Sequence, residues 1–329
     1  MKNTGILRIQ AFGARQSSPI EGVLVTVSGN GFTAQRITDE TGTAADLSIE
    51  APSCALSLQE DNTIRPYAVV DLTAAKAGFR TVRIQGVQIF AGQVTLAQPE
   101  MIPETEEDRD VVNPPIVIPE HSLFTGDGGS GPDPMENCVP RVLDRVIIPK
   151  NITVHLGKPA ASARNVTVSF RDYIANVASS EVYPTWPEQA LRANILAQIS
   201  LALNRIWTEW YPSRGYSFNI TNSPGVDQAY VRGRTVFAVM ERLTAELFNT
   251  YVRRTGDTEP YYTEYCDGKS VTCPGMKQWG TVDRAKEGKS ALEILRYYYG
   301  SRVQLVTTNN IASIPQSYPG SPLRRGSTG

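Results

Sequence analysis

Glu181 is the residue of this 329-residue chain whose type and setting best suit acid–base chemistry. It lies in SSEVYPTWPEQALRANILAQISLALNRIWTEWY, residues 179–211, just before the apolar repeat of a helix, with Val182, Tyr183 and Trp186 close behind it. Apolar neighbours that shelter a carboxyl group raise its pKa, as a general acid near neutral pH requires. Most glutamates are solvated surface groups, and that reading is the alternative.

The other residues that could carry chemistry are few. His121 and His155 are the two histidines, which excludes a His-rich metal site, and among the four cysteines only Cys266 and Cys273 are close in sequence. A zinc site normally takes four ligands, and no His lies near this pair, so a local disulfide or two neighbouring thiols is favoured over half of a metal site. No cofactor is expected. A net charge of −1 without long basic runs gives no sign of a nucleic-acid-binding surface.

Two regions joined by a linker must position these residues, which predicts a multidomain protein. Residues 1–102 alternate apolar and polar positions, as in GILRIQAF and GVLVTVSG, and VRIQGVQIFAGQVTLAQ is typical of a hairpin. The pattern predicts an all-β, Ig-like sandwich of roughly seven strands. Residues 103–137 are rich in Pro, Gly and acids, which indicates a linker, and PPIVIPE within it could dock as an extended strand.

Residues 138–308 predict an α+β domain. NITVHLG and RNVTVSFRDYIANV open it as strands, and VQLVTT closes it. A helix follows a capping box of Thr185 and Glu188, with Pro187 in its first turn and an apolar stripe as far as Trp210. Three further helices are expected: about 234–254, ended by Gly256; about 278–287; and one from the capping box of Ser290 and Glu293 to Gly300. Residues 309–329 form a second linker.

Four blocks of this domain, in order, resemble the SpoIID/LytB family (stage II sporulation protein D and relatives). They are YIANVASSEVYPTWPEQALRAN, DQAY at 227–230, GMKQWGTVDRAKEG and EILRYYYG, and the resemblance covers roughly residues 150–308. It implies a SpoIID-like fold. The family's enzymes are lytic transglycosylases of peptidoglycan, which cut the bond between N-acetylmuramic acid and N-acetylglucosamine without water. The family's catalytic acid matches Glu181.

The chemistry that the resemblance implies needs only one carboxyl group. The C6 hydroxyl of the muramic acid attacks its own C1 and leaves a 1,6-anhydro end, so the same group can first donate a proton and then accept one. Ordinary glycoside hydrolases instead use a pair of carboxylates. A lone Glu181 with a raised pKa fits the intramolecular route.

The matched blocks also suggest residues that bind substrate. Asp227 and Gln228 either hydrogen-bond sugar or pin a turn. Tyrosines could stack on sugar rings, although a helical Tyr is more often part of the core. The predicted substrate-binding residues are Trp186, Asp227, Gln228, Tyr230, Gln278 and Trp279, and the candidate stacking tyrosines are Tyr261, Tyr262, Tyr265, Tyr297, Tyr298 and Tyr299.

The chain departs from the family pattern at two places. The family's usual Arg falls on Gln198, so an Arg that would orient the Glu is missing unless Arg205 replaces it from two turns further on. The loop between Cys266 and Cys273 precedes Gln278 and is expected at the cleft rim.

The flanking segments carry weaker resemblances. PIEGVLVTV, TDETGTAADLSI and KAGFRTVRI resemble carboxypeptidase-regulatory-like or transthyretin-like domains, which serve as spacers and binding modules. LRRGSTG at the end resembles the opening of a small peptidoglycan-binding domain, so the chain is expected to be a fragment of a longer protein.

The leading hypothesis is a peptidoglycan lytic transglycosylase whose partners are glycan strands of the cell wall or spore envelope. The alternatives are an inactive glycan-binding or structural module, and a component of a spore or phage-like assembly. MKNTGILRIQ lacks the apolar run of a secretory signal, and no stretch is apolar enough to span a membrane, so the compartment stays open.

Overall fold

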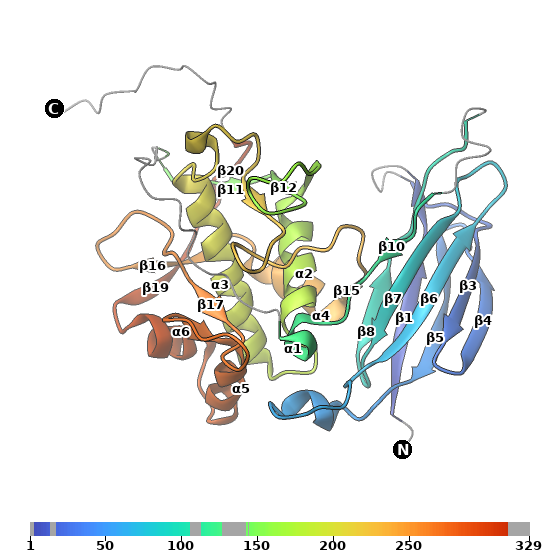
Figure 1. Cartoon of the computed structure of the whole chain (residues 1–329), viewed down its shortest axis with the longest axis horizontal. Helices are drawn as coiled ribbons and strands as arrows, with labels where there is room; N and C mark the ends of the chain where they lie inside the picture. Colours follow the sequence, from blue (N-terminus) through green and yellow to red (C-terminus); the bar gives the residue numbers. More distant parts are fainter. Residues whose placement is uncertain (1–2, 14–17, 106–112, 127–142, 144, 315–329) are drawn as a thin grey trace.

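The computed structural model describes residues 3–13, 18–105, 113–126, 143 and 145–314. This part of the chain mixes many β-strands with six α-helices. Figure 1 shows the strands of the N-terminal region stacked on one side of the molecule and the helices gathered on the other. The tail that resembles a peptidoglycan-binding domain lies outside the described residues. No helix of the described part is long and apolar enough to cross a membrane.

Two sheets form the N-terminal sandwich, and their facing side chains alternate along each strand. Leu7 and Ile9 of one sheet and Val25 and Val27 of the other are fully or almost fully buried. One sheet has the order β15 (Val236–Phe237), β8 (Val94–Ala97), β1 (Thr4–Gln10), β5 (Thr43–Glu50), and the other β10 (Ile116–Val117), β7 (Val82–Ile89), β6 (Ala68–Ala75), β3 (Leu24–Gly29), β4 (Phe32–Ile37). β2 (Phe12–Gly13) pairs with β9 (Glu100–Met101) beside them.

The expected hairpin of VRIQGVQIFAGQVTLAQ is wrong. β7 pairs with β6 and β10, whereas β8 pairs in parallel with β1 in the other sheet. Phe90, between the two strands, packs against the rings of Tyr183 and Phe237 in the second region rather than within the sandwich. The docking of PPIVIPE is confirmed, because β10 adds to β7 with Ile116 opposite Ile84. β15 comes from the second region, so the two regions share a sheet.

The second region is built around the buried helix α3 (Glu188–Trp207). The other helices are α1 (Ser122–Thr125), α2 (Phe170–Glu181), α4 (Ala238–Leu247), α5 (Gln278–Lys286) and α6 (Ala291–Tyr299), with 3-10 turns at Cys54–Leu58 and Pro212–Arg214. Helices α2, α4, α5 and α6 all pack against α3, and small sheets close the remaining sides. The strands are β11 (Ile148–Pro149), β12 (Asn151–His155), β13 (Asn165–Ser169), β14 (Ile220–Thr221), β16 (Thr250–Arg254), β17 (Tyr265–Cys266), β18 (Met276–Lys277), β19 (Val303–Thr307) and β20 (Ile311–Ala312).

Several expected helix boundaries are confirmed. α5 and α6 occupy the predicted ranges, and the capping box of Ser290 and Glu293 forms at the start of α6. The strand VQLVTT is β19, which pairs with β16. These features depend on contacts between residues close in sequence, so a local pattern is enough to predict them.

Three local predictions are wrong. Thr185 does not cap α3, whose N-cap is Pro187 without a side-chain bond, because the Thr185 hydroxyl binds Ser57 Oγ at 2.5 Å. The helix expected over 234–254 is only α4, because Tyr251 belongs to strand β16, and Gly256 therefore lies in the turn after that strand. RDYIANV is helix α2 rather than strand, because Ser169 Oγ accepts the amide of Asp172 and starts a helix there.

Candidate active site

Glu181 is the last residue of α2, and its side chain is buried, with 2% of the residue exposed. The helix ends there because Val182 takes an extended conformation, φ −133° and ψ 146°. An extended turn then leads to α3, which starts at Glu188. The carboxyl group therefore sits at the junction of two buried helices and not on an ordinary surface.

Three donors from distant parts of the chain hold the Glu181 carboxylate. Oε1 accepts the backbone amide of Ala229 at 2.8 Å. Oε2 accepts the Gln198 carboxamide at 2.8 Å and the Tyr265 hydroxyl at 2.6 Å. The donors belong to α3, to the loop after β14 and to β17, so the tertiary fold assembles this group.

Burial dominates the ionisation of Glu181. Removal from water raises the pKa of the carboxyl to about 7, although the bonds from Tyr265, Ala229 and Gln198 each favour the charged form. Burial and the charge of Glu181 raise the pKa of Tyr265 well above its usual value, so the phenol stays a donor. A carboxyl group with a pKa near 7 can both donate and accept a proton at neutral pH, as a group with two successive roles must.

The raised pKa also predicts how stability depends on pH. Because the folded state holds the Glu181 proton more tightly than the unfolded state, the stabilisation present below about pH 4.5 is lost as pH rises through about 7. Between pH 5 and pH 8 this lowers the free energy of unfolding by about 2–3 kcal/mol. Glu181→Gln should remove that loss in urea unfolding at the two pH values. Equal pH dependence in the wild type and the variant would contradict it.

Gln198 takes the orienting position that the sequence comparison assigned to a missing Arg. Its carboxamide donates to Glu181 directly, while Arg205 lies about two turns further along α3 and binds Asp227 instead. Of the two alternatives left open by the sequence, Arg205 therefore does not replace the missing Arg beside the acid. A neutral donor holds the acid, which leaves its pKa high, whereas an adjacent guanidinium would lower it.

Asp227 pins a turn inside the protein. Its carboxylate is fully buried and accepts Arg205 Nε at 2.8 Å, the Tyr211 hydroxyl at 2.5 Å, and the amide and hydroxyl of Thr221 at 2.9 and 2.7 Å. Of the two readings considered for Asp227, these contacts favour turn pinning over sugar binding. The turn matters for the acid because it carries Ala229, whose amide binds Glu181.

Gln228 forms a second layer behind the acid. Its Nε2 donates to the Gln198 carbonyl at 3.1 Å and to the Tyr265 hydroxyl at 3.0 Å, and its Oε1 accepts the Tyr173 hydroxyl at 2.9 Å. The sequence indicates Tyr265 only as a candidate for stacking on sugar rings, whereas the structure places its hydroxyl on the acid. One signal in the sequence points to the position of Tyr265. The residue directly precedes Cys266, and the disulfide of Cys266 with Cys273 holds strand β17 in place.

The predicted substrate-binding aromatics are in the core. The rings of Trp186 and Trp279 lie 5.0 Å apart and are 3% and 6% exposed, and Trp186 Nε1 donates to the Ser57 carbonyl at 2.9 Å. Tyr230 is also buried and stacks on Tyr173 at 5.6 Å. These three side chains pack in the core around Glu181. Their contacts do not place them in a cleft, where substrate binding would need them.

Gln278 differs from those aromatics because its buried side chain lacks protein partners. Neither its Oε1 nor its Nε2 has a hydrogen-bond partner within the described residues, and the same holds for Gln198 Oε1 and Asn194 Oδ1. Buried amide atoms normally find a partner in protein, water or ligand. Gln278 therefore stays the predicted substrate contact with the most unused hydrogen-bonding capacity.

Cys266 and Cys273 form a disulfide that closes the loop before Gln278. The bond ties β17, which carries Tyr265, to the approach of β18. Within the described residues no group of His, Cys, Asp and Glu could hold a metal ion. Of the other two cysteines, Cys54 is free and exposed, and Cys138 lies outside the described residues.

Removing this disulfide should lower stability measurably. Cys266→Ala with Cys273→Ala is expected to cost about 2 kcal/mol of unfolding free energy, because the open loop gains entropy in the unfolded chain. Urea unfolding with and without dithiothreitol measures it, and the exposed Cys54→Ala serves as the matched control. A wild type whose stability does not respond to dithiothreitol would contradict the prediction.

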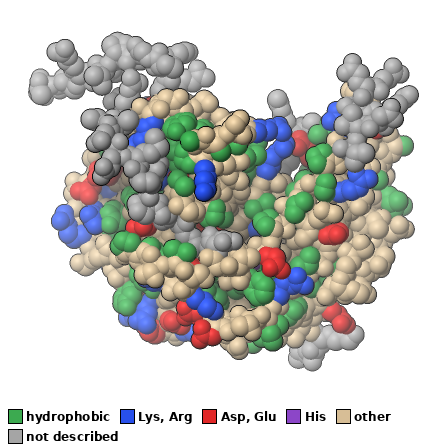
Figure 2. All heavy atoms as spheres, in the orientation of Figure 1, with side chains coloured by type: hydrophobic (Ala, Val, Ile, Leu, Met, Phe, Trp, Pro, Cys, Tyr) green, Lys and Arg blue, Asp and Glu red, His purple; other side chains and the backbone are tan. Residues whose placement is uncertain are grey.

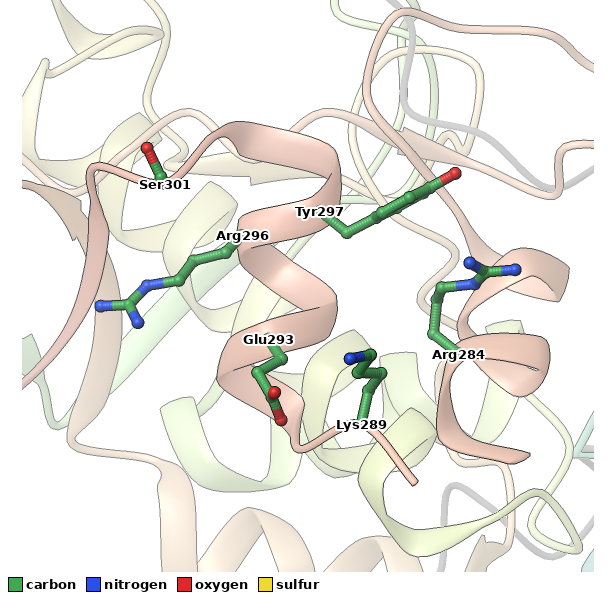
Figure 3. A pocket seen from close by; sticks show the side chains of 6 residues that line it. All are labelled: Arg284, Lys289, Glu293, Arg296, Tyr297 and Ser301. Carbon is green, nitrogen blue, oxygen red and sulfur yellow. The ribbon is translucent and has the colours of Figure 1, made fainter. Parts of the chain in front are cut away.

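A separate open pocket of about 320 Å³ lies on the outer side of α5 and α6. It is lined by Arg284, Lys289, Glu293, Arg296, Tyr297 and Ser301. Figure 3 shows Arg284 beside the Tyr297 ring, with 5.0 Å from the guanidinium carbon to the ring centroid. Neither Glu181 nor any of its three donors lines this pocket.

On the face drawn in Figure 2, basic and acidic side chains are interspersed.

Comparison with known proteins gives no family for this chain. No protein-family model and no curated protein matches it. Among solved structures, the Bacillus anthracis TIE protein is 14% identical over 31% of this chain and 17% of its own length, with a TM-score of 0.23. The Klebsiella pneumoniae 5-hydroxyisourate hydrolase is 21% identical over 30% of this chain and 92% of its own, with a TM-score of 0.21. The catechol 1,2-dioxygenase of Acinetobacter sp. ADP1 is 15% identical over 36% and 59%, with a TM-score of 0.23. At these TM-scores none of the likenesses bears on fold or function.

Proposed function

We propose that the second region is a SpoIID-like lytic transglycosylase that cuts peptidoglycan glycan strands, with Glu181 as its acid and base. The observation that carries the proposal is the Glu181 carboxyl itself. It is buried, its pKa is about 7, and its hydrogen-bond partners are an amide, a carboxamide and a phenol rather than a second carboxylate. One carboxyl group of this kind suits a reaction that has no attacking water.

The proposed reaction balances with a single proton. Protonated Glu181 donates its proton to the glycosidic oxygen as the bond from the muramic acid C1 breaks. The C6 hydroxyl of the same sugar attacks C1, and the Glu181 carboxylate takes the proton of that hydroxyl. The products are a 1,6-anhydro-muramic end and a free hydroxyl on the departing sugar, and the enzyme is returned to its starting protonation state.

The neighbours of Glu181 stabilise it in the charged state between the two proton transfers. Tyr265, Gln198 and the amide of Ala229 all donate to the carboxylate. Such donors are already oriented before the charge develops, which lowers the cost of the intermediate state. Because the residue is 2% exposed, substrate must displace part of its cover to bring a glycosidic oxygen within hydrogen-bonding distance.

The test is mass spectrometry of purified peptidoglycan, both intact and stripped of stem peptides, after incubation with the protein. New 1,6-anhydro-muramic ends on either substrate would support the proposal and identify the preferred glycan. A folded protein that forms no such ends on either substrate would overturn it. Comparison of the two substrates also decides whether stem peptides must first be removed.

A glycan-binding or structural module is the second candidate function. The observation that favours it is the burial of Glu181, which is 2% exposed and so has little surface through which to reach a glycosidic oxygen. Binding to peptidoglycan that survives Glu181→Gln, with no anhydro product from the wild type, would support this candidate. The N-terminal sandwich would then act as a carboxypeptidase-regulatory-like or transthyretin-like binding module. Alternatively, it would dock the chain onto a particle. Stable association of the whole chain with such a particle would test the docking role.

A further inference from the structure

The backbone that carries Glu181 is held by groups from the N-terminal half of the chain. Ser122, in the segment that follows the sandwich, donates its hydroxyl to the Ser180 carbonyl at 2.8 Å. His121 in the same segment lies with Nε2 at 3.3 Å from the Val182 carbonyl. The residues directly before and after the acid are therefore fixed by a segment that a sequence pattern assigns to a linker.

The turn between α2 and α3 is held in the same way by the sandwich itself. The 3-10 turn at Cys54–Leu58 places the Ser57 hydroxyl 2.5 Å from the Thr185 hydroxyl. The Ser57 carbonyl accepts Trp186 Nε1 at 2.9 Å. Both contacts are buried or partly buried, where a hydrogen bond resists exchange with water.

Arg234 connects the two halves through a buried charge. Its Nη1 donates to Ser180 Oγ at 2.8 Å, and its Nη2 donates to Gln88 Oε1 on strand β7 of the sandwich at 3.3 Å. Its Nε donates to the Thr235 carbonyl at 3.0 Å. Desolvation lowers the pKa of Arg234 to about 9, so the guanidinium is still charged at neutral pH. None of the ion pairs among the described residues involves Arg234, which makes its burial costly.

The segment after Arg234 extends the same connection. β15 (Val236–Phe237) pairs with β8 of the sandwich, and the Phe237 amide donates to Ser179 Oγ at 3.2 Å. The Phe237 ring packs edge-on against Phe90 at 5.3 Å. The pairing of β15 with the sandwich sheet thus fixes the backbone next to Arg234. The guanidinium of Arg234 binds Ser180, the residue before Glu181.

We infer that Arg234 is a positioning residue for Glu181, and that the sandwich is part of the scaffold of the active site rather than a spacer. The inference rests on the proposed function for its catalytic meaning. Its physical content is that the geometry of Ser180, and through it the burial of the Glu181 carboxyl, depends on the bridge from Gln88 through Arg234.

The experiment compares the full-length chain with Arg234→Met, Arg234→Lys and Gln88→Leu. The matched control is Arg232→Met, which makes the same change two residues away at an exposed position. Carbon-13 NMR of labelled glutamate carboxyl groups, with the Glu181 signal assigned from Glu181→Gln, reports the pKa of the acid. Release of anhydro ends from peptidoglycan reports kcat and KM.

Arg234→Met should let water reach the carboxyl and lower the Glu181 pKa by about one unit or more towards its ordinary value. kcat should fall about tenfold to a hundredfold with little change in KM, because the acid is misplaced while glycan contacts remain. Arg234→Lys keeps the charge and should restore part of both properties. Arg232→Met should leave both unchanged.

The outcomes separate this inference from the proposed function. Folded Arg234→Met and Gln88→Leu proteins that keep the wild-type titration of Glu181 would overturn the inference, whatever their activity. A shifted titration together with an inactive wild type would support the positioning role and remove only the proposed reaction. If Arg234→Met does not fold, Gln88→Leu decides, because it breaks the bridge while the Arg234 charge and its bond to Ser180 stay in place.

Discussion

Glu181→Gln is expected to abolish the release of 1,6-anhydro-muramic ends, with a loss of rate of about a thousandfold or more. The amide has nearly the shape of the acid but holds no transferable proton at neutral pH. It can therefore neither protonate the glycosidic oxygen nor take the proton of the C6 hydroxyl. Mass spectrometry of digested peptidoglycan measures the loss, with circular dichroism to establish that the variant is folded.

Glu264→Gln is the matched control for that loss. Glu264 precedes Tyr265, and its pKa is also raised by burial. Its backbone carbonyl accepts the Met276 amide and the Tyr299 hydroxyl, and its carboxyl group forms no hydrogen bond within the described residues. The same chemical change at this position should leave turnover close to that of the wild type. An active Glu181→Gln protein would remove the acid–base role, and equal losses in both variants would point to a general effect on folding.

Asp227→Asn is expected to lower the free energy of unfolding by about 3–5 kcal/mol, the largest stability effect in the second region. The substitution keeps the size of the side chain but leaves the Arg205 guanidinium, 3% exposed, without a counter-charge. The amide would also direct hydrogens at one of the donors that now meet Asp227, namely Tyr211 or Thr221. Urea unfolding followed by tryptophan fluorescence and by circular dichroism measures the change.

Asp46→Asn provides the comparison for an exposed pair. Asp46 accepts two bonds from Arg8 in the sandwich, and their side chains are 39% and 49% exposed. An exposed pair of this kind contributes at most about 1 kcal/mol, because water and salt screen it. A loss at Asp227 no larger than the loss at Asp46 would contradict the structural role given to the buried pair.

The sequence by itself determined most of the local elements of this protein. The alternating strands of the sandwich, the apolar stripe of α3 and the capping box of α6 all follow from neighbouring residues. The shelter of Glu181 was also visible, because Val182, Tyr183 and Trp186 follow it and all three are buried. The closeness of Cys266 and Cys273 follows from their short separation, whereas the structure decides that they form a disulfide. Each feature depends on contacts within about ten residues, where periodicity and capping are informative.

Only the tertiary structure decided which groups hold the acid. Gln198, Ala229 and Tyr265 are 17, 48 and 84 residues away from Glu181, and no local pattern pairs them with it. The separation of β7 and β8 into two sheets, and the addition of β15 to one of them, are pairings of the same long-range kind. A hydrogen bond between distant residues depends on how whole helices and sheets pack, because the free energy of burying their apolar faces exceeds the contribution of any single polar contact. The positions of Arg234 and Asp227 inside the protein follow from that packing and not from their neighbours in the chain.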